Sequence, residues 1–112
     1  MSAAPSFDVS VFPERTCVRV RPSGEIDLAT AGLLDAEIQE LWDSGWKDVI
    51  ADLRQVTFLD SSGLRILVIH HRRAVARGVR FAIIDGSGPV SRVLALTGID
   101  QVLQYVSADD IG

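Results

Sequence analysis

Two adjacent serines follow an aspartate near the middle of the chain, in the segment Asp60-Ser61-Ser62-Gly63. The segment separates an apolar run from a stretch with helical periodicity, so we expect it to begin a helix. Backbone N–H groups at a helix N-terminus lack partners within the helix, and Ser or Asp side chains accept hydrogen bonds from them. An ordinary capped helix start is therefore the simplest interpretation of these residues.

A serine can also be a nucleophile, which requires a general base and an oxyanion hole around it. The two histidines, His70 and His71, lie more than two turns further along the same predicted helix. At about 1.5 Å per residue they are roughly 13–15 Å from Ser61, too far to activate it. Adjacent helical residues also point about 100° apart, so the pair cannot chelate one ion. We expect no catalytic residues and no metal site.

The helix after Asp60 is predicted to have two distinct faces at about 100° per residue. The predicted core face comprises Leu64, Leu67, Val68, His71 and Val75. The predicted outer face comprises Ser62, Ile66, Ile69 and Arg73, with Arg65 and Arg77 beside it. Apolar residues next to arginines are typical of a protein-docking surface. A covering helix, or isolated exposed apolar residues, would explain the pattern equally well.

Strands and helices alternate along the remaining chain. Strands are predicted over 7–12, 16–21, 49–53, 80–84 and 103–106, with a short apolar segment over 56–59. Helices are predicted over 29–44, from Ser61 or Ser62 to about 78, and from Pro89 to Thr97. A turn at 22–24 should let the first two strands pair antiparallel, and Asp27 or Thr30 should cap the first helix. The pattern predicts a small α/β sheet, with parallel pairing where helices intervene.

Length and composition restrict the possible functions. The 112 residues fit one domain, and 47% of them are apolar, which is enough for a core. The net charge of −4 argues against direct DNA binding. Cys17 is the only cysteine, so no internal disulfide can form. Since no secretory signal or membrane-spanning run is evident, we expect a cytoplasmic protein with no membrane association.

Four segments together resemble the STAS-domain family, and in particular the bacterial anti-sigma factor antagonists. They are Gly24-Glu25-Ile26-Asp27, Asp52-Leu53, Phe58-Leu59-Asp60-Ser61-Ser62-Gly63-Leu64 and Leu96-Thr97-Gly98-Ile99. The resemblance implies a single domain over 1–112, with a mixed sheet and helices packed on one side. Its core should span about 7–106, and residues 1–6 and 107–112 should be flexible tails.

The resemblance also implies a regulatory phosphoprotein of a stress response that works by partner switching and needs no cofactor. The unmodified protein would bind an anti-sigma factor that is itself a serine kinase, which releases a sigma factor for transcription. Phosphorylation at Ser61 would abolish binding, and a phosphatase of the PP2C type would reset the switch. The expected partner-binding residues are Asp27, Asp60, Ser61, Ser62, Gly63, Arg65, Ile66, Ile69 and Arg73.

Two alternatives remain open at the level of sequence. The chain could be a STAS accessory subunit or scaffold of a transport or stress-sensing complex that never meets a kinase. The glycine-rich segment 85–89 could bind a nucleotide weakly, although it lacks the lysine and the spacing of phosphate-binding loops. A strand-to-helix turn explains that segment fully.

Overall fold

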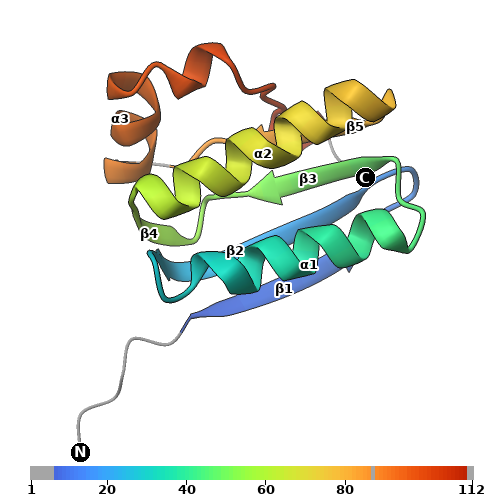
Figure 1. The fold of residues 1–112 in the computed structure, drawn as a ribbon, viewed down its shortest axis with the longest axis horizontal. Helices are drawn as coiled ribbons and strands as arrows, with labels where there is room; N and C mark the ends of the chain where they lie inside the picture. The colour runs from blue at the N-terminus through green and yellow to red at the C-terminus, as the bar shows by residue number, and fades with distance from the viewer. Residues whose placement is uncertain (1–6, 87, 111–112) are drawn as a thin grey trace, which may run out of the picture.

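A computed structural model describes residues 7–86 and 88–110 as one mixed sheet with three α-helices (Figure 1). The strands are β1 (Asp8–Pro13), β2 (Val18–Ile26), β3 (Asp48–Asp52), β4 (Val56–Leu59) and β5 (Arg80–Ile84). The helices are α1 (Ala31–Asp43), α2 (Ser61–Arg77) and α3 (Pro89–Leu96), with short 3₁₀ helices η1 (Ile99–Gln101) and η2 (Ala108–Asp110). The predicted α/β fold class is confirmed. The expected tail residues 1–6 and 111–112, and Ser87 of the glycine-rich turn, lie outside the described residues.

The sheet has the strand order β1-β2-β3-β5, and β4 pairs with the second half of β2. Strands β1 and β2 are antiparallel, and the other pairs are parallel. The turn predicted at 22–24 is wrong, because β2 continues through it to Ile26. Pro22 falls between the stretch that pairs with β3 and the stretch that pairs with β4, so its missing N–H removes no bond from either parallel ladder.

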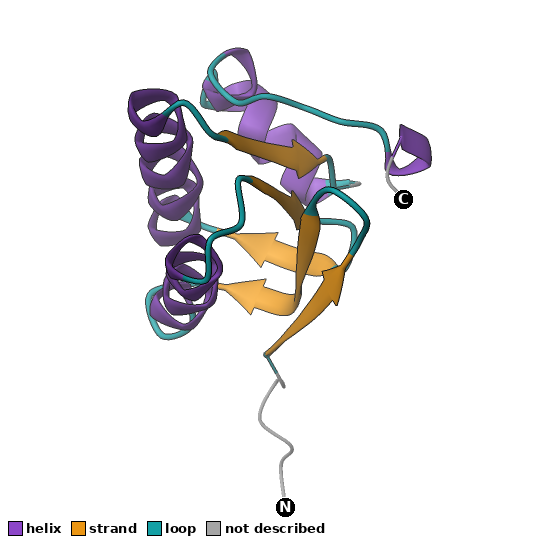
Figure 2. Cartoon of the chain, turned by 90° about the vertical axis from the view of Figure 1, so that its right-hand side faces the viewer, coloured by secondary structure: helices purple, strands orange, loops and turns teal. Residues whose placement is uncertain are grey.

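Helices α1 and α2 lie side by side on one face of the sheet, as Figure 2 shows. Alternate strand residues such as Val49 and Ala51 face these helices and join one buried cluster, to which α3 adds Val90 and Leu94. Ile50 points to the opposite face, where η2 lies, and belongs to a second, smaller cluster. Successive side chains of β3 thus pack into apolar clusters on both faces of the sheet, which is why its sequence is apolar almost throughout.

Two predictions about local structure are wrong. Residues 103–106 form a single bridge between Tyr105 and Ile83 rather than an edge strand. The core face of α2 is also displaced: the buried positions are Gly63, Leu64, Leu67, His70 and Ala74. Val75 is 68% exposed, and Val68 and His71 are half-buried.

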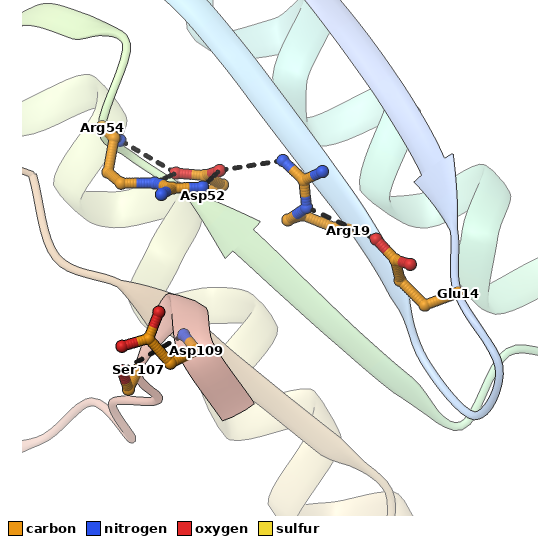
Figure 3. Close-up of polar contacts among 6 residues, drawn as sticks. All are labelled: Glu14, Arg19, Asp52, Arg54, Ser107 and Asp109. Atoms are coloured by element: carbon orange, nitrogen blue, oxygen red, sulfur yellow. Dashed lines mark hydrogen bonds and ion pairs between the residues drawn. The ribbon is translucent and has the colours of Figure 1, made fainter. Parts of the chain in front are cut away.

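A buried carboxylate, Asp52, lies at the end of β3 (Figure 3). Arg54 bonds both of its oxygens, at 2.9 and 2.7 Å, and Arg19 donates to it at 3.0 Å. Burial acts to raise the pKa of Asp52, but the hydrogen bonds from Arg54 and Arg19 outweigh it and hold that pKa below its usual value. Both arginines therefore have a structural ion-pair role.

Candidate functional site

Ser61 is the first residue of α2 and is exposed to solvent. Asp60 caps the helix, because its extended backbone lets the carboxylate accept a hydrogen bond from the Ser62 N–H at 2.8 Å. The Asp60 N–H in turn donates to the carbonyl of Ile26 at 3.2 Å, which fixes the helix start against the end of β2. Ser61 is thus held at a rigid corner, and no described side chain hydrogen-bonds its hydroxyl.

Gly63 lies on the inner side of the same turn and is buried. A Cβ atom at this position would come within 2.3 Å of Leu59 Cδ1 and 2.7 Å of Ile26 Cγ2. Only glycine allows this close approach of the helix to β2 and β4 without a shift of those side chains. Gly63 thus has a packing role that positions its neighbours, and the partner contact expected there stays a prediction.

The loop between β2 and α1 is fixed by reciprocal bonds between Asp27 and Thr30. The Asp27 carboxylate accepts from the backbone N–H groups of Ala29 and Thr30, at 2.9 and 3.2 Å. The Thr30 hydroxyl accepts from the Asp27 N–H at 3.0 Å and donates to the Glu25 carbonyl at 2.7 Å. Thr30 is the N-cap residue of α1 but makes no side-chain cap hydrogen bond, so the side chains of Asp27 and Thr30 stabilise the loop rather than cap the helix. The loop projects Leu28, which is 86% exposed.

A groove of about 600 Å³ runs between α1 and α2 and begins at Ser61. Helix α1 and the loop before it contribute Leu28, Ala31, Gly32 and Asp35. Helix α2 contributes Ser61, Ser62, Arg65, Ile66, Ile69 and Arg73. The structure therefore brings together six of the nine predicted site residues. Asp27 and Asp60 flank the groove at its Ser61 end without lining it.

A second groove, of about 520 Å³, lies on the other side of α2, toward Ile99 in η1. It shares Ser61, Arg65 and Ile69 with the first groove. These three residues are spaced four apart, so they form one ridge along the helix with a groove on each side. The phosphate that the sequence predicts at Ser61 would stand at the head of this ridge.

A buried histidine joins the two helices that enclose the first groove. The indole N–H of Trp42 donates to Nδ1 of His70 at 3.1 Å, and Nε2 of His70 lies 2.6 Å from Asp35 Oδ1. Since Nδ1 accepts, His70 is neutral, with its proton on Nε2 pointing to Asp35. Burial lowers the pKa of His70 despite the opposing hydrogen bond with Asp35. Both ring nitrogens of His70 are therefore already hydrogen-bonded, and His70 cannot act as a base for Ser61.

Sequence reasoning missed Leu28 and Asp35 as groove residues. Leu28 gave no sequence signal, because only the structure shows that it is exposed. Asp35 gave no such signal, since its role depends on His70, which lies far away in the sequence. Among the described residues, no group of three His, Cys, Asp or Glu side chains could hold a metal ion. Within the same residues, no helix is both long and apolar enough to cross a bilayer.

Comparison with known proteins gives consistent matches over most of the chain. The model of the STAS domain matches residues 9–109. The anti-sigma-F factor antagonist RsfB of Mycobacterium tuberculosis is 31% identical over 107 residues, which cover 96% of this chain and 87% of RsfB. The crystal structure of an anti-sigma factor antagonist from Mycobacterium paratuberculosis is 30% identical, with a TM-score of 0.79 over 98% of this chain and 94% of that one. The Bacillus cell fate determinant SpoIIAA in its phosphorylated form shares the fold, with a TM-score of 0.68 and 21% identity over 94% of this chain and 95% of that one.

Proposed function

The chain belongs to the STAS domain family, and we propose that it is an anti-sigma factor antagonist whose binding is controlled at Ser61. Two relatives at 30–31% identity are named as anti-sigma factor antagonists, and both match nearly the whole of this chain. Their names support the same role here. The observation that carries the proposal is the exposure of Ser61 at the head of a ridge with a groove on each side. A modifying enzyme and a binding partner would both have access to this hydroxyl.

The proposed cycle has two covalent steps. An anti-sigma factor with serine kinase activity transfers the γ-phosphoryl group of ATP to the Ser61 hydroxyl oxygen. The bond to the bridging oxygen of ADP breaks, and the hydroxyl proton leaves to a base of the kinase or to solvent. A phosphatase of the PP2C type later hydrolyses the phosphoserine with one water molecule, which restores the hydroxyl and releases inorganic phosphate.

The physical effect of the phosphate would be to exclude a docked partner. A phosphoserine carries about −1.5 to −2 charges at neutral pH and three strong acceptor oxygens. The Ser62 N–H already donates to Asp60, but the positive end of the helix dipole still favours an anion here, so α2 can keep its position. A partner surface that fits closely over a neutral hydroxyl would instead have to bury a dianion next to Asp60. No large conformational change is needed for the switch.

The experiment that tests this function is phosphorylation followed by intact-mass measurement. The purified chain is incubated with ATP and the anti-sigma factor kinase of the same organism, and the modified residue is located by fragmentation. We expect a gain of one phosphoryl group on Ser61, none on Ser61→Ala, and an unchanged gain on Ser62→Ala as the matched control. An unmodified wild-type chain, or phosphate located on another residue, would contradict the proposal.

A further inference from the structure

Helix α2 concentrates positive charge on an otherwise acidic protein. It contains four arginines and no acidic residue, whereas the whole chain has a net charge of −4. The four arginines are Arg65, Arg72, Arg73 and Arg77. The two grooves beside the helix are lined by three of these arginines and by one acidic side chain, Asp35, which is already bonded to His70. A partner of complementary charge would therefore be acidic where it meets the ridge.

Arg65 is the exposed arginine nearest to Ser61 and lies between the two grooves. It forms no ion pair with any acidic residue of the described chain, whereas Arg73 donates to Gln39 at 3.0 Å. Residues four apart on a helix have Cβ atoms about 5–6 Å apart, and helical side chains lean toward the N-terminus. The guanidinium of Arg65 thus covers the turn that begins with Ser61.

We propose that Arg65 is a contested cation: it binds an acidic side chain of the partner when Ser61 is free, and the phosphate when Ser61 is modified. The partner segment has an apolar side chain that packs on Ile69 and acidic side chains that meet Arg65 and Arg73. This proposal rests on the proposed function and names the chemistry of its partner. Phosphorylation then has two effects. It adds a charge that repels the acidic partner, and it pairs Arg65 with the phosphate so that this cation no longer binds the partner.

Binding of the Ser61 phosphate by Arg65, here called the capture, is favoured because it is intramolecular. The phosphate and the guanidinium belong to one rigid helix, so pairing them orders only two side chains. An ion pair at this spacing, with the anion N-terminal to the cation, has the orientation that helices favour. The partner's carboxylate must instead compete from another molecule, and the phosphate carries up to twice its charge.

The capture can be measured without any partner. Phosphoserine is installed at position 61 by chemical or genetic means, and its second ionisation is followed by ³¹P NMR as a function of pH. We expect Arg65→Gln to raise the phosphate pKa by about 0.2–0.4 relative to the unsubstituted phosphoprotein, because the favourable ion pair is lost. Arg77→Gln, on the same helix but outside both grooves, should leave the pKa unchanged. Identical titrations for Arg65→Gln and the unsubstituted phosphoprotein would overturn the capture.

The partner contact is measured by titration of the unphosphorylated chain against its anti-sigma factor at two salt concentrations. Arg65→Gln should weaken binding about tenfold and reduce the salt dependence, because a charge-assisted contact is lost. Arg77→Gln should change neither quantity. Equal affinity of Arg65→Gln and wild type would overturn the acidic-partner inference and leave control at Ser61 intact. Failure of the wild type to bind at all would contradict the proposed function, and the inferred partner contact with it.

Discussion

Nε2 of His70, a fully buried side chain of α2, lies 2.6 Å from Oδ1 of Asp35 on α1. This bond joins the two helices that form the first groove, and Asp35 itself lines that groove. The Trp42 N–H fixes the neutral form of the imidazole from the other side. One wall of the groove thus includes a carboxylate that is held by a buried imidazole of the opposite helix.

The lowered pKa of His70 predicts a loss of stability in mild acid. The unfolded chain binds a proton near pH 6.5, whereas the folded chain does so only at lower pH. The free energy of unfolding should therefore be constant above about pH 7 and should decrease as the pH falls below about 6.5. The contribution of His70 to this slope cannot exceed about 1.4 kcal/mol per pH unit, since it binds one proton.

Urea unfolding at several pH values between 7.5 and 5 measures this slope. His70→Gln should lower stability at pH 7 by about 1–3 kcal/mol, because it disrupts buried hydrogen bonds, and should flatten the pH dependence. His71→Gln, at the neighbouring half-buried histidine that makes no hydrogen bond to Asp35 or Trp42, is the matched control for the substitution. A wild-type slope that persists in His70→Gln would refute the assignment to this residue.

The displaced core face of α2 shows where sequence reasoning stops. The helical wheel favoured His71 and Val75 because they continue the stripe of Leu64, Leu67 and Val68 at about 100° per residue. In the structure His70 is buried, since Asp35 and Trp42 satisfy both of its nitrogens from another helix. Such partners lie far away in the chain and leave no periodic signal near His70.

Where local chemistry decides the outcome, the sequence was sufficient. The strand at Arg80–Ile84 has the predicted limits, because a short apolar run there is bounded by turn residues on both sides. Gly78 ends α2 in a left-handed conformation, and Pro89 begins α3, both as predicted. The grooves could not be predicted, because their walls come from helices whose relative position depends on tertiary packing.

Two glycines in helices should respond in opposite ways to alanine. Gly63→Ala should destabilise the fold by about 1–3 kcal/mol, because the new methyl group meets Leu59 and Ile26 at distances that force both to move. Gly32→Ala in α1 should stabilise it by about 0.5–1 kcal/mol, since nothing lies within 4 Å of the added Cβ. Thermal and urea unfolding of both variants measure the difference. Equal effects would contradict the close packing at Gly63.

Leu28 should contribute to partner affinity with little effect on stability. Its side chain is 86% exposed and lines the first groove, so Leu28→Gln removes apolar contact area from the proposed interface. We expect affinity for the anti-sigma factor to fall about tenfold and the unfolding free energy to change by less than about 0.5 kcal/mol. Leu96→Gln on α3, where Leu96 is 79% exposed and lines neither groove beside α2, is the control. A comparable loss for both variants would indicate a nonspecific effect of surface hydrophobicity.

The most direct measurement compares two substitutions of one side chain, Ser61→Ala and Ser61→Asp, in calorimetric titrations against the anti-sigma factor. Alanine keeps a small neutral group at the corner above Asp60 and should bind as tightly as the wild type. Aspartate puts a permanent negative charge there and should weaken binding at least tenfold, with unchanged thermal stability because an acidic residue suits a helix N-terminus. If both variants bind with the same affinity, charge at this position does not govern the complex, and the account of a switch at Ser61 is wrong.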